Sequence, residues 1–306
     1  MAEDDRKLRF IEAATQAMAE HASPFLTQVV GVGGEEEGQP LCTGFFCEFQ
    51  GRKLIATAAH VISDLKGEGH QGVVFTRGEG EAPAVVDGEV VVFEEVDLAV
   101  YLPGSDFPLP STKKHWPEGR IERDPTSIRR DYLVLTGFPR RFSRRTRHFG
   151  GVIFSEAMTY GAMMRYREED VPEAEREEFD RDLPDYPFLP ADLLKPHEFA
   201  IHFDATPEMF LGRNPDPDDP RGVEDRLGVF EEGPSSKLRT FSPTGLSGSP
   251  VFRLGSSGVR ADDWTPDRAR LVGVATQWLS AHKILVATSS ATLLEALAKA
   301  TGGEDG

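Results

Sequence analysis

Residues 244–252 read Thr-Gly-Leu-Ser-Gly-Ser-Pro-Val-Phe, with Ser247 between Gly245 and Gly248 and ahead of an apolar run. Glycine tolerates backbone angles that other residues avoid, so this stretch predicts a strained turn that presents the Ser247 hydroxyl at the start of a strand. The backbone N–H groups of Gly245 and Ser247 would then point together at a developing oxyanion. A Gly-rich turn with a serine is also a common structural feature, so both interpretations stay open for this stretch alone.

Two further patterns lie upstream. Thr57-Ala58-Ala59-His60-Val61 follows a predicted strand directly, and its small residues allow a tight turn that projects the imidazole of His60. Asp97 opens the apolar run Asp97-Leu98-Ala99-Val100-Tyr101. A carboxylate there is costly unless a protonated group pairs with it, and a histidine is the natural partner. Taken singly, a capping or core histidine and a turn-capping aspartate explain these patterns equally well.

Short β-branched or aromatic runs separated by turns dominate the chain, which predicts two sets of six strands. The first set covers 25–32, 41–49, 53–58, 72–77, 85–93 and 97–102, and the second covers 132–137, 148–157, 198–204, 249–254, 270–278 and 283–288. Helical spacing predicts one helix near residues 3–20 and a closing helix over 289–300. Because strands and helices do not alternate, the pattern favours an all-β fold of two six-stranded antiparallel barrels.

The predicted organisation has four parts: an N-terminal helix (1–22), a first β-barrel with a linker (23–120), a second β-barrel (121–290) and a C-terminal helix with a tail (291–306). Two long insertions interrupt the second barrel, near 158–197 and 205–240. The first contains a charged segment that could form one solvated helix, and the second is rich in Pro and Asp, which predicts loop or partial disorder. Both are long for plain connections, so they are either decoration or surfaces that contact a substrate or a regulator.

The order His60, Asp97, Ser247, with the first two on one strand set and the third on the other, resembles trypsin-like serine proteases of the chymotrypsin fold. TAAHV is similar to the TAAH motif of that family, DLAV to its Asp segment and GLSGSP to its GxSGxP loop. Gly137-Phe138-Pro139 also looks like a turn that is frequent in bacterial members. The resemblance covers about residues 25–290 apart from the insertions.

The resemblance implies a role for each matching residue. Ser247 would be the nucleophile, His60 the general base and Asp97 the residue that fixes the imidazole tautomer, with the N–H groups of Gly245 and Ser247 as the oxyanion hole. The site would lie between the two barrels. The residues expected to contact the substrate are Phe241, Thr244, Thr276 and Trp278.

The chain also departs from the family pattern. Leu246 stands where digestive proteases carry an Asp that pairs with a freed N-terminal amine, so activation by N-terminal trimming is not expected. Phe241 stands where a trypsin-type pocket carries an acidic residue, which favours an apolar or small substrate side chain over Arg or Lys. The lack of disulfides and the few residues after Ser247 place the chain near bacterial intracellular or Deg-type relatives without a PDZ domain.

Composition excludes several classes of protein. The chain has 34 basic and 51 acidic side chains, a net charge of −17 that argues against binding nucleic acid or an anionic membrane. No long apolar run predicts a membrane span, and the first twenty residues lack the apolar region of a secretory signal, so we expect a cytoplasmic protein. Cys42 and Cys47 would lie roughly 16 Å apart on opposite faces of one strand, so they predict free thiols. Without CxxC or HExxH, we expect no metal and no cofactor.

The sequence therefore predicts a serine endopeptidase that acts on a protein or peptide substrate, with narrow or regulated activity. Three alternatives remain open at this point. One is a binding module that keeps the fold with an idle triad, and another is an esterase or acyl hydrolase that uses the same triad. The third is a zymogen-like protein that needs an activating partner.

Overall fold

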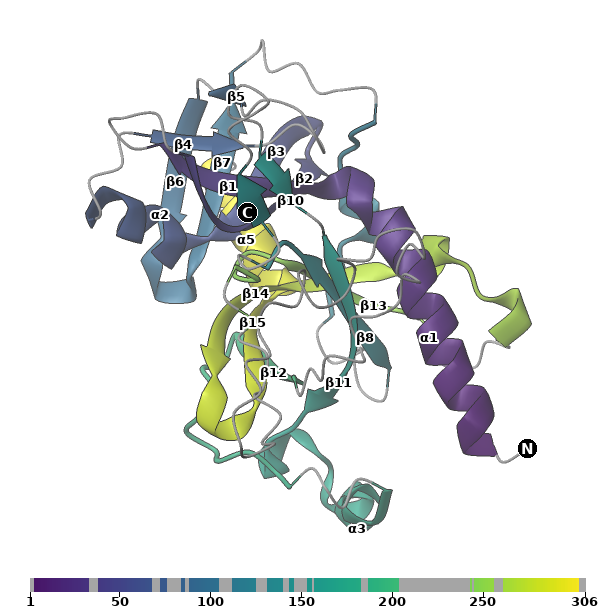
Figure 1. The fold of residues 1–306 in the computed structure, drawn as a ribbon. Coiled ribbons are helices and arrows are strands. Elements are labelled where there is room, and N and C mark those ends of the chain that lie inside the picture. Colours follow the sequence, from purple (N-terminus) through teal and green to yellow (C-terminus); the bar gives the residue numbers. More distant parts are fainter. Residues whose placement is uncertain are drawn as a thin grey trace, which may run out of the picture.

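The structure is a computed structural model dominated by β-strands, with few helices (Figure 1). It describes residues 3–32, 38–67, 72–75, 84–85, 88–104, 112–124, 131–139, 143–145, 153–155, 157–182, 187–203, 243, 245–255 and 261–302. Within these ranges no helix is both long enough and apolar enough to cross a bilayer. The predicted second insertion, 205–240, lies outside the described residues.

The first half of the chain forms a seven-stranded antiparallel sheet in the order β5-β4-β1-β2-β3-β7-β6. Its strands are β1 Leu26–Val32, β2 Gly38–Phe49, β3 Arg52–Ala58, β4 Gly72–Phe75, β5 Ala84–Val85, β6 Gly88–Phe93 and β7 Leu98–Pro103. The two edge strands, β5 and β6, are consecutive in the chain. Val85 and Gly88 are three residues apart and so lie within about 11 Å of each other, which means that the sheet curls and brings its edges together at that corner.

The prediction of a single strand over 85–93 is therefore wrong, and the sheet has seven strands where six were expected. The stretch contains two short strands with different partners, because β5 pairs with β4 and β6 pairs with β7. Gly88 allows β6 to begin beside β7, since a Cβ on Gly88 would lie 2.3 Å from the carbonyl oxygen of Leu102.

The second half forms a closed six-stranded antiparallel barrel in the order β11-β12-β15-β14-β13-β8, which confirms the predicted fold class for this half. Its strands are β8 Tyr132–Gly137, β11 Met158–Arg165, β12 Glu198–His202, β13 Pro250–Arg253, β14 Arg270–Leu279 and β15 Ile284–Ser289. Three of these strands precede Ser247 in the chain and three follow it, as expected from the sequence.

One predicted strand of the barrel lies elsewhere in the structure. Within the predicted strand 148–157, β10 (Ile153–Ser155) pairs with β9 (Ser143–Arg145) in a separate two-stranded sheet. The barrel strand is instead β11, which pairs with β8 and occupies the expected start of the first insertion. β11 reads MTYGAMMR, so Thr159 is its one β-branched residue, and its alternation depends on the buried Tyr160 and Ala162.

The two predicted terminal helices are present, and the charged insertion contains a helix as expected. Among the described residues, the α-helices are α1 Glu3–Ala22, α2 Ala59–Gly67, α3 Glu173–Asp182 and α5 Ser290–Ala300. α1 runs along the second barrel beside β11 (Figure 1). The two elements are so close at Gly161 that a Cβ on this residue would lie 2.7 Å from Thr15 Oγ1. α2 was not predicted, although it begins one residue before His60.

Trp116 joins the two halves. Its fully buried ring lies 5.0 Å from the ring of Phe25, next to β1, and 4.6 Å from the ring of Phe252 in the barrel. Met18 of α1 and Leu293 of α5 belong to the same apolar cluster. This shared core fixes the two halves relative to each other, and the polar residues at their junction are placed by it.

Candidate active site

His60 lies in the first turn of α2, directly after β3, where helix N–H groups lack partners within the helix. Asp97 accepts hydrogen bonds from two of these N–H groups. The Ala59 N–H donates to the Asp97 carbonyl oxygen at 3.2 Å, and the His60 N–H donates to Asp97 Oδ1 at 2.8 Å. The carboxylate thus caps α2 and holds the backbone of His60.

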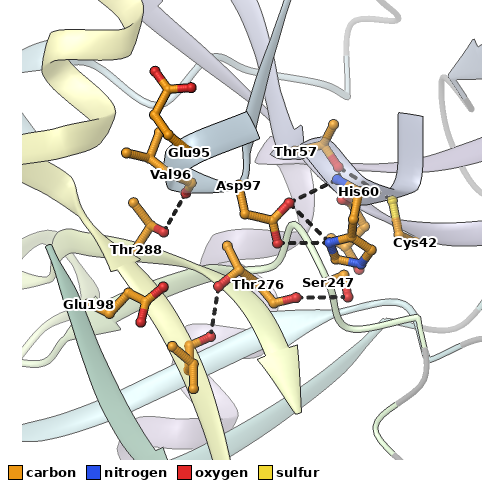
Figure 2. Close-up of polar contacts among 12 residues, drawn as sticks. Cys42, Thr57, His60, Glu95, Val96, Asp97, Glu198, Ser247, Thr276 and Thr288 are labelled. Atoms are coloured by element: carbon orange, nitrogen blue, oxygen red, sulfur yellow. Dashed lines mark hydrogen bonds and ion pairs between the residues drawn. The ribbon is translucent and has the colours of Figure 1, made fainter. Parts of the chain in front are cut away.

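The same carboxylate holds the imidazole of His60. His60 Nδ1 lies 2.8 Å from Asp97 Oδ2 and 3.1 Å from Asp97 Oδ1 (Figure 2). Because an ionised carboxylate only accepts hydrogen bonds, Nδ1 carries the proton and Nε2 has the lone pair in the neutral ring. The His60 side chain remains 41% exposed, so solvent or a substrate can reach the ring. Such a pair has a defined tautomer and the chemistry that a general base requires.

Asp97 has left-handed backbone angles, with φ 52° and ψ 44°. Such a conformation costs a non-glycine residue roughly 1–2 kcal/mol and persists where the surroundings impose it. The Asp97 N–H donates to the Glu94 carbonyl oxygen at 3.3 Å, across the short 3₁₀ turn Glu94–Val96. This backbone conformation directs the carboxylate toward His60.

The turn that carries Ser247 has left-handed backbone at both glycines, with φ of 96° at Gly245 and 81° at Gly248. Within the turn, the Leu246 N–H donates to the Pro243 carbonyl oxygen and the Ser249 N–H to the Leu246 carbonyl oxygen, each at 2.9 Å. Among the described residues, no acceptor is found for the N–H groups of Gly245 and Ser247. These are the two groups that the sequence predicts for an oxyanion hole.

The Ser247 turn lies against the first sheet. The Thr43 N–H of β2 donates to the Ser247 carbonyl oxygen at 3.0 Å. Gly248 is packed so closely that a Cβ there would lie 2.0 Å from the Thr43 carbonyl oxygen and 2.4 Å from Thr57 Oγ1. Thr57 precedes His60 by three residues, and Figure 2 shows the imidazole flanked by Asp97 and Ser247. The packing of the two halves therefore brings the three predicted triad residues to one place.

Ser247 Oγ is weakly held. It donates to the Thr276 carbonyl oxygen at 3.4 Å, which is long for a hydroxyl donor, so the side chain can rotate toward another partner (Figure 2). Thr276 lies at a bulge in β14, and its own hydroxyl donates to the Val286 carbonyl oxygen at 3.3 Å. The predicted contact residue Thr276 therefore faces Ser247 with its carbonyl group.

The other predicted substrate contacts are only partly described. Trp278 lies in β14, and its ring packs at 5.5 Å against the buried Phe203 at the edge of the barrel core. Phe241 and Thr244 lie outside the described residues. Leu246, the departure from the family pattern, is 2% exposed and belongs to the barrel core. An apolar side chain thus anchors the Ser247 turn from within the barrel.

Neither cysteine is suited to act as a nucleophile. Both are free and fully buried, and burial raises the pKa of Cys42 and of Cys47 to about 12. A thiol reacts as its thiolate, which such a pKa suppresses at neutral pH. Within the described part of the chain, no group of three His, Cys, Asp or Glu side chains could hold a metal ion.

Two residues of the site, Thr43 and Thr57, are not predicted from the sequence. The Thr57 hydroxyl donates to the Thr43 carbonyl oxygen at 2.7 Å, and the Thr43 hydroxyl donates to the Gly245 carbonyl oxygen at 3.1 Å. Both are fully buried polar residues within strands. A threonine in an otherwise apolar run, as in Leu41-Cys42-Thr43-Gly44-Phe45, was the available signal.

No protein-family model matches the chain, and no curated protein matches it. Among solved structures, it is similar to catalytically active tobacco etch virus protease complexed with product. The TM-score is 0.42 and the sequence identity 10%, over 92% of this chain and 80% of that chain.

Proposed function

We propose that the protein is a serine endopeptidase in which Ser247, His60 and Asp97 form the catalytic triad. The observation that carries the proposal is the two-point contact of Asp97 with His60, through Nδ1 and through the backbone N–H, beside a glycine-flanked serine. A histidine that only packs within the fold would not need a carboxylate on Nδ1 while 41% of its side chain stays exposed. A general base does.

The reaction would proceed by acyl transfer. Ser247 Oγ attacks the carbonyl carbon of the scissile peptide bond while His60 Nε2 takes the hydroxyl proton, and Asp97 stabilises the resulting imidazolium. The N–H groups of Gly245 and Ser247 stabilise the oxyanion of the tetrahedral intermediate. His60 then returns the proton to the leaving amine as the C–N bond breaks. Water, deprotonated by His60, hydrolyses the acyl-enzyme and regenerates Ser247.

The finer assignments follow from the residues at the site. Ser247 makes the nucleophile a hydroxyl, and the two buried thiols support a serine mechanism over a cysteine mechanism. We further propose that the protein is of the bacterial intracellular or Deg-type class, since its cysteines are unpaired and Leu246 cannot form an ion pair with a freed N-terminal amine. An apolar or small side chain next to the cleaved bond is proposed from Phe241.

The proposal is tested by incubating the purified protein with a fluorophosphonate probe, which phosphonylates an activated serine. We expect labelling of the parent, and a loss of about 10⁴-fold or more in Ser247→Ala and His60→Ala. Ser280→Ala removes an exposed serine away from the site and is the matched control, with parental labelling expected. Mass spectrometry should locate the adduct on Ser247, and an adduct elsewhere would contradict the assignment.

Peptide hydrolysis distinguishes the proposal from its closest alternative. A parent that is labelled should also cleave an unfolded protein such as reduced casein at sites that mass spectrometry can map. Turnover of an activated ester without cleavage of any protein would instead identify an acyl hydrolase. A parent that is never labelled, alone or with added protein partners, would identify a binding module.

A further inference from the structure

Two threonine hydroxyls cross the junction between the two halves in opposite directions. Thr43, on β2 of the first sheet, donates to the Gly245 carbonyl oxygen in the Ser247 turn at 3.1 Å. Thr288, on β15 of the barrel, donates to the Val96 carbonyl oxygen at 2.8 Å, directly before Asp97 (Figure 2). Each half thus supplies one hydroxyl to the backbone that carries a triad residue of the other half.

Thr43 makes contacts on both sides of Ser247. Its hydroxyl donates to the Gly245 carbonyl oxygen and accepts the Phe138 N–H at 2.7 Å, while its backbone N–H donates to the Ser247 carbonyl oxygen at 3.0 Å. The side chain is fully buried, so water cannot replace these contacts at low cost. The hydroxyl therefore links the predicted Gly137-Phe138-Pro139 turn to the nucleophile turn.

These contacts determine which backbone groups of the turn remain available. The Gly245–Leu246 peptide is held at its carbonyl by Thr43 and at its N–H by Pro243. The peptide after Ser247 is held at its carbonyl by the Thr43 N–H and at its own N–H by Ala275. Between them, the Leu246–Ser247 peptide is bound, among the described residues, only through its carbonyl, to the Ser249 N–H. With both neighbours fixed, the direction of the Ser247 N–H is fixed as well.

Thr288 acts on the Asp97 turn in the same way. Its contact holds the carbonyl of the Val96–Asp97 peptide, whose N–H donates to the Glu94 carbonyl oxygen at 3.3 Å. That peptide precedes the left-handed Asp97, so its orientation sets φ of this strained residue. Thr288 is also fully buried. The barrel thereby helps to maintain the conformation that directs the carboxylate to His60.

We propose that Thr43 and Thr288 are positioning residues: each fixes the peptide unit next to a triad residue of the opposite half, so that the site is formed correctly only when the two halves are packed together. The contacts join residues separated by 202 and 192 positions, so they cannot form locally. This inference rests on the proposed serine chemistry, and its test keeps the two apart.

The first measurement is the second-order rate constant of fluorophosphonate labelling. Thr43→Val and Thr288→Val keep the shape of the side chain and remove the hydroxyl, whereas Thr43→Ser and Thr288→Ser retain it. We expect the valine variants to be labelled about 10- to 100-fold more slowly, less than the roughly 10²–10³-fold cost of losing an oxyanion donor. The serine variants should stay within about threefold of the parent. Parental rates in both valine variants would overturn the inference.

A matched control separates positioning from stability. Thr301 is another buried threonine, and its hydroxyl donates to the carbonyl oxygens of Leu297 and Ala298 at the end of α5. Thr301→Val should be labelled at the parental rate. Rates are compared at a temperature where circular dichroism shows every variant folded. A loss in Thr301→Val equal to that in the other valine variants would show a general effect of removing buried hydroxyls and contradict the inference.

The second measurement does not depend on activity. In amide hydrogen exchange, Thr43→Val should accelerate exchange over 245–249 and leave 94–97 unchanged, and Thr288→Val should do the reverse. Unchanged exchange in both segments would overturn the inference whatever the labelling shows. The predicted exchange pattern in a parent that is not labelled would support the positioning roles and reject the proposed serine chemistry.

Discussion

The turns that carry Asp97 and Ser247 both need left-handed backbone, and they obtain it differently. The Ser247 turn uses glycines, which adopt positive φ without a steric cost and leave room for Thr43 and Thr57. The Asp97 turn places a carboxylate in the strained conformation, because that side chain must cap α2 and hold His60. The Ser247 turn therefore requires residues without a side chain, whereas the Asp97 turn requires a particular side chain.

The largest effect is expected for Asp97→Asn, which changes the chemistry of the side chain and retains its role in holding the backbone. Asparagine tolerates left-handed angles and keeps an oxygen that accepts the His60 N–H, so Asp97→Asn should cost less than about 1 kcal/mol of unfolding free energy. It cannot stabilise the imidazolium or enforce the tautomer, so the fluorophosphonate labelling rate should fall by about 10⁴-fold. Urea denaturation and labelling measure the two quantities. A labelling rate within tenfold of the parent would contradict the assigned role of Asp97.

The next effect tests whether the Ser247 turn needs glycine for space. Gly248→Ala places a Cβ 2.0 Å from the Thr43 carbonyl oxygen in addition to the strain of φ 81°, so we expect a loss of about 3 kcal/mol or more and no labelling. Gly51 is the matched control, because its φ is 72° and nothing lies within 4 Å of a Cβ there. Gly51→Ala should cost only about 1 kcal/mol in urea denaturation. Equal losses of unfolding free energy in the two variants would show that the positive φ alone, and not the crowding of a Cβ, determines the cost.

A smaller effect is expected at the contact behind the Ser247 turn. A Cβ on Gly137 would lie 1.9 Å from Ser249 Oγ and 2.7 Å from Thr43 Oγ1, so Gly137→Ala should cost about 2 kcal/mol. Ser249 Oγ is buried without a hydrogen-bond partner among the described residues, so Ser249→Ala should change stability by less than about 0.5 kcal/mol. In the double variant the loss should be smaller than in Gly137→Ala alone. Strict additivity in a thermal-unfolding cycle would refute this crowding.

Features with a local signal are predicted well from the sequence. The glycines of the Ser247 turn are visible in the sequence, where His60 follows one predicted strand and Asp97 opens another. β8 is predicted with its observed bounds, because it is a short apolar run, buried almost throughout, that ends at a glycine. β11 is missed because its methionines and glycine leave Thr159 as the one β-branched residue of the strand.

The contacts that hold the site are not predictable in the same way. Thr43 and Thr288 look like ordinary β-branched strand residues, and their roles depend on acceptors that the packing of the two halves brings near. The left-handed conformation of Asp97 has no local signal either, since aspartate is compatible with many turns. Local preference predicts which residues form turns, and tertiary packing determines how two turns meet.

The smallest expected effect is a loss of stability at acid pH, which depends on His115 in the linker between the two halves. His115 packs its ring against Phe46 of β2 at 5.7 Å, and burial, aided by the charge of Lys53, lowers the pKa of His115 to about 4. The unfolded chain takes up this proton near pH 6.5 and the folded chain does not, so His115 contributes stability above pH 6.5 that is progressively lost between pH 6.5 and 4. His21, whose pKa is lowered by burial and then by Arg120, acts in the same direction.

Both histidines lie beside Trp116, since His21 contacts its ring at 5.9 Å and His115 precedes it in the chain. Acid should therefore weaken the shared core that aligns the Asp97 turn with the Ser247 turn. We expect the urea midpoint to fall between pH 7 and pH 5, and to fall less in His115→Gln, which no longer titrates. The same decrease in parent and variant would assign the acid sensitivity to other groups. A rise of the midpoint on acidification would have the opposite sign and would exclude a neutral His115 in the folded protein.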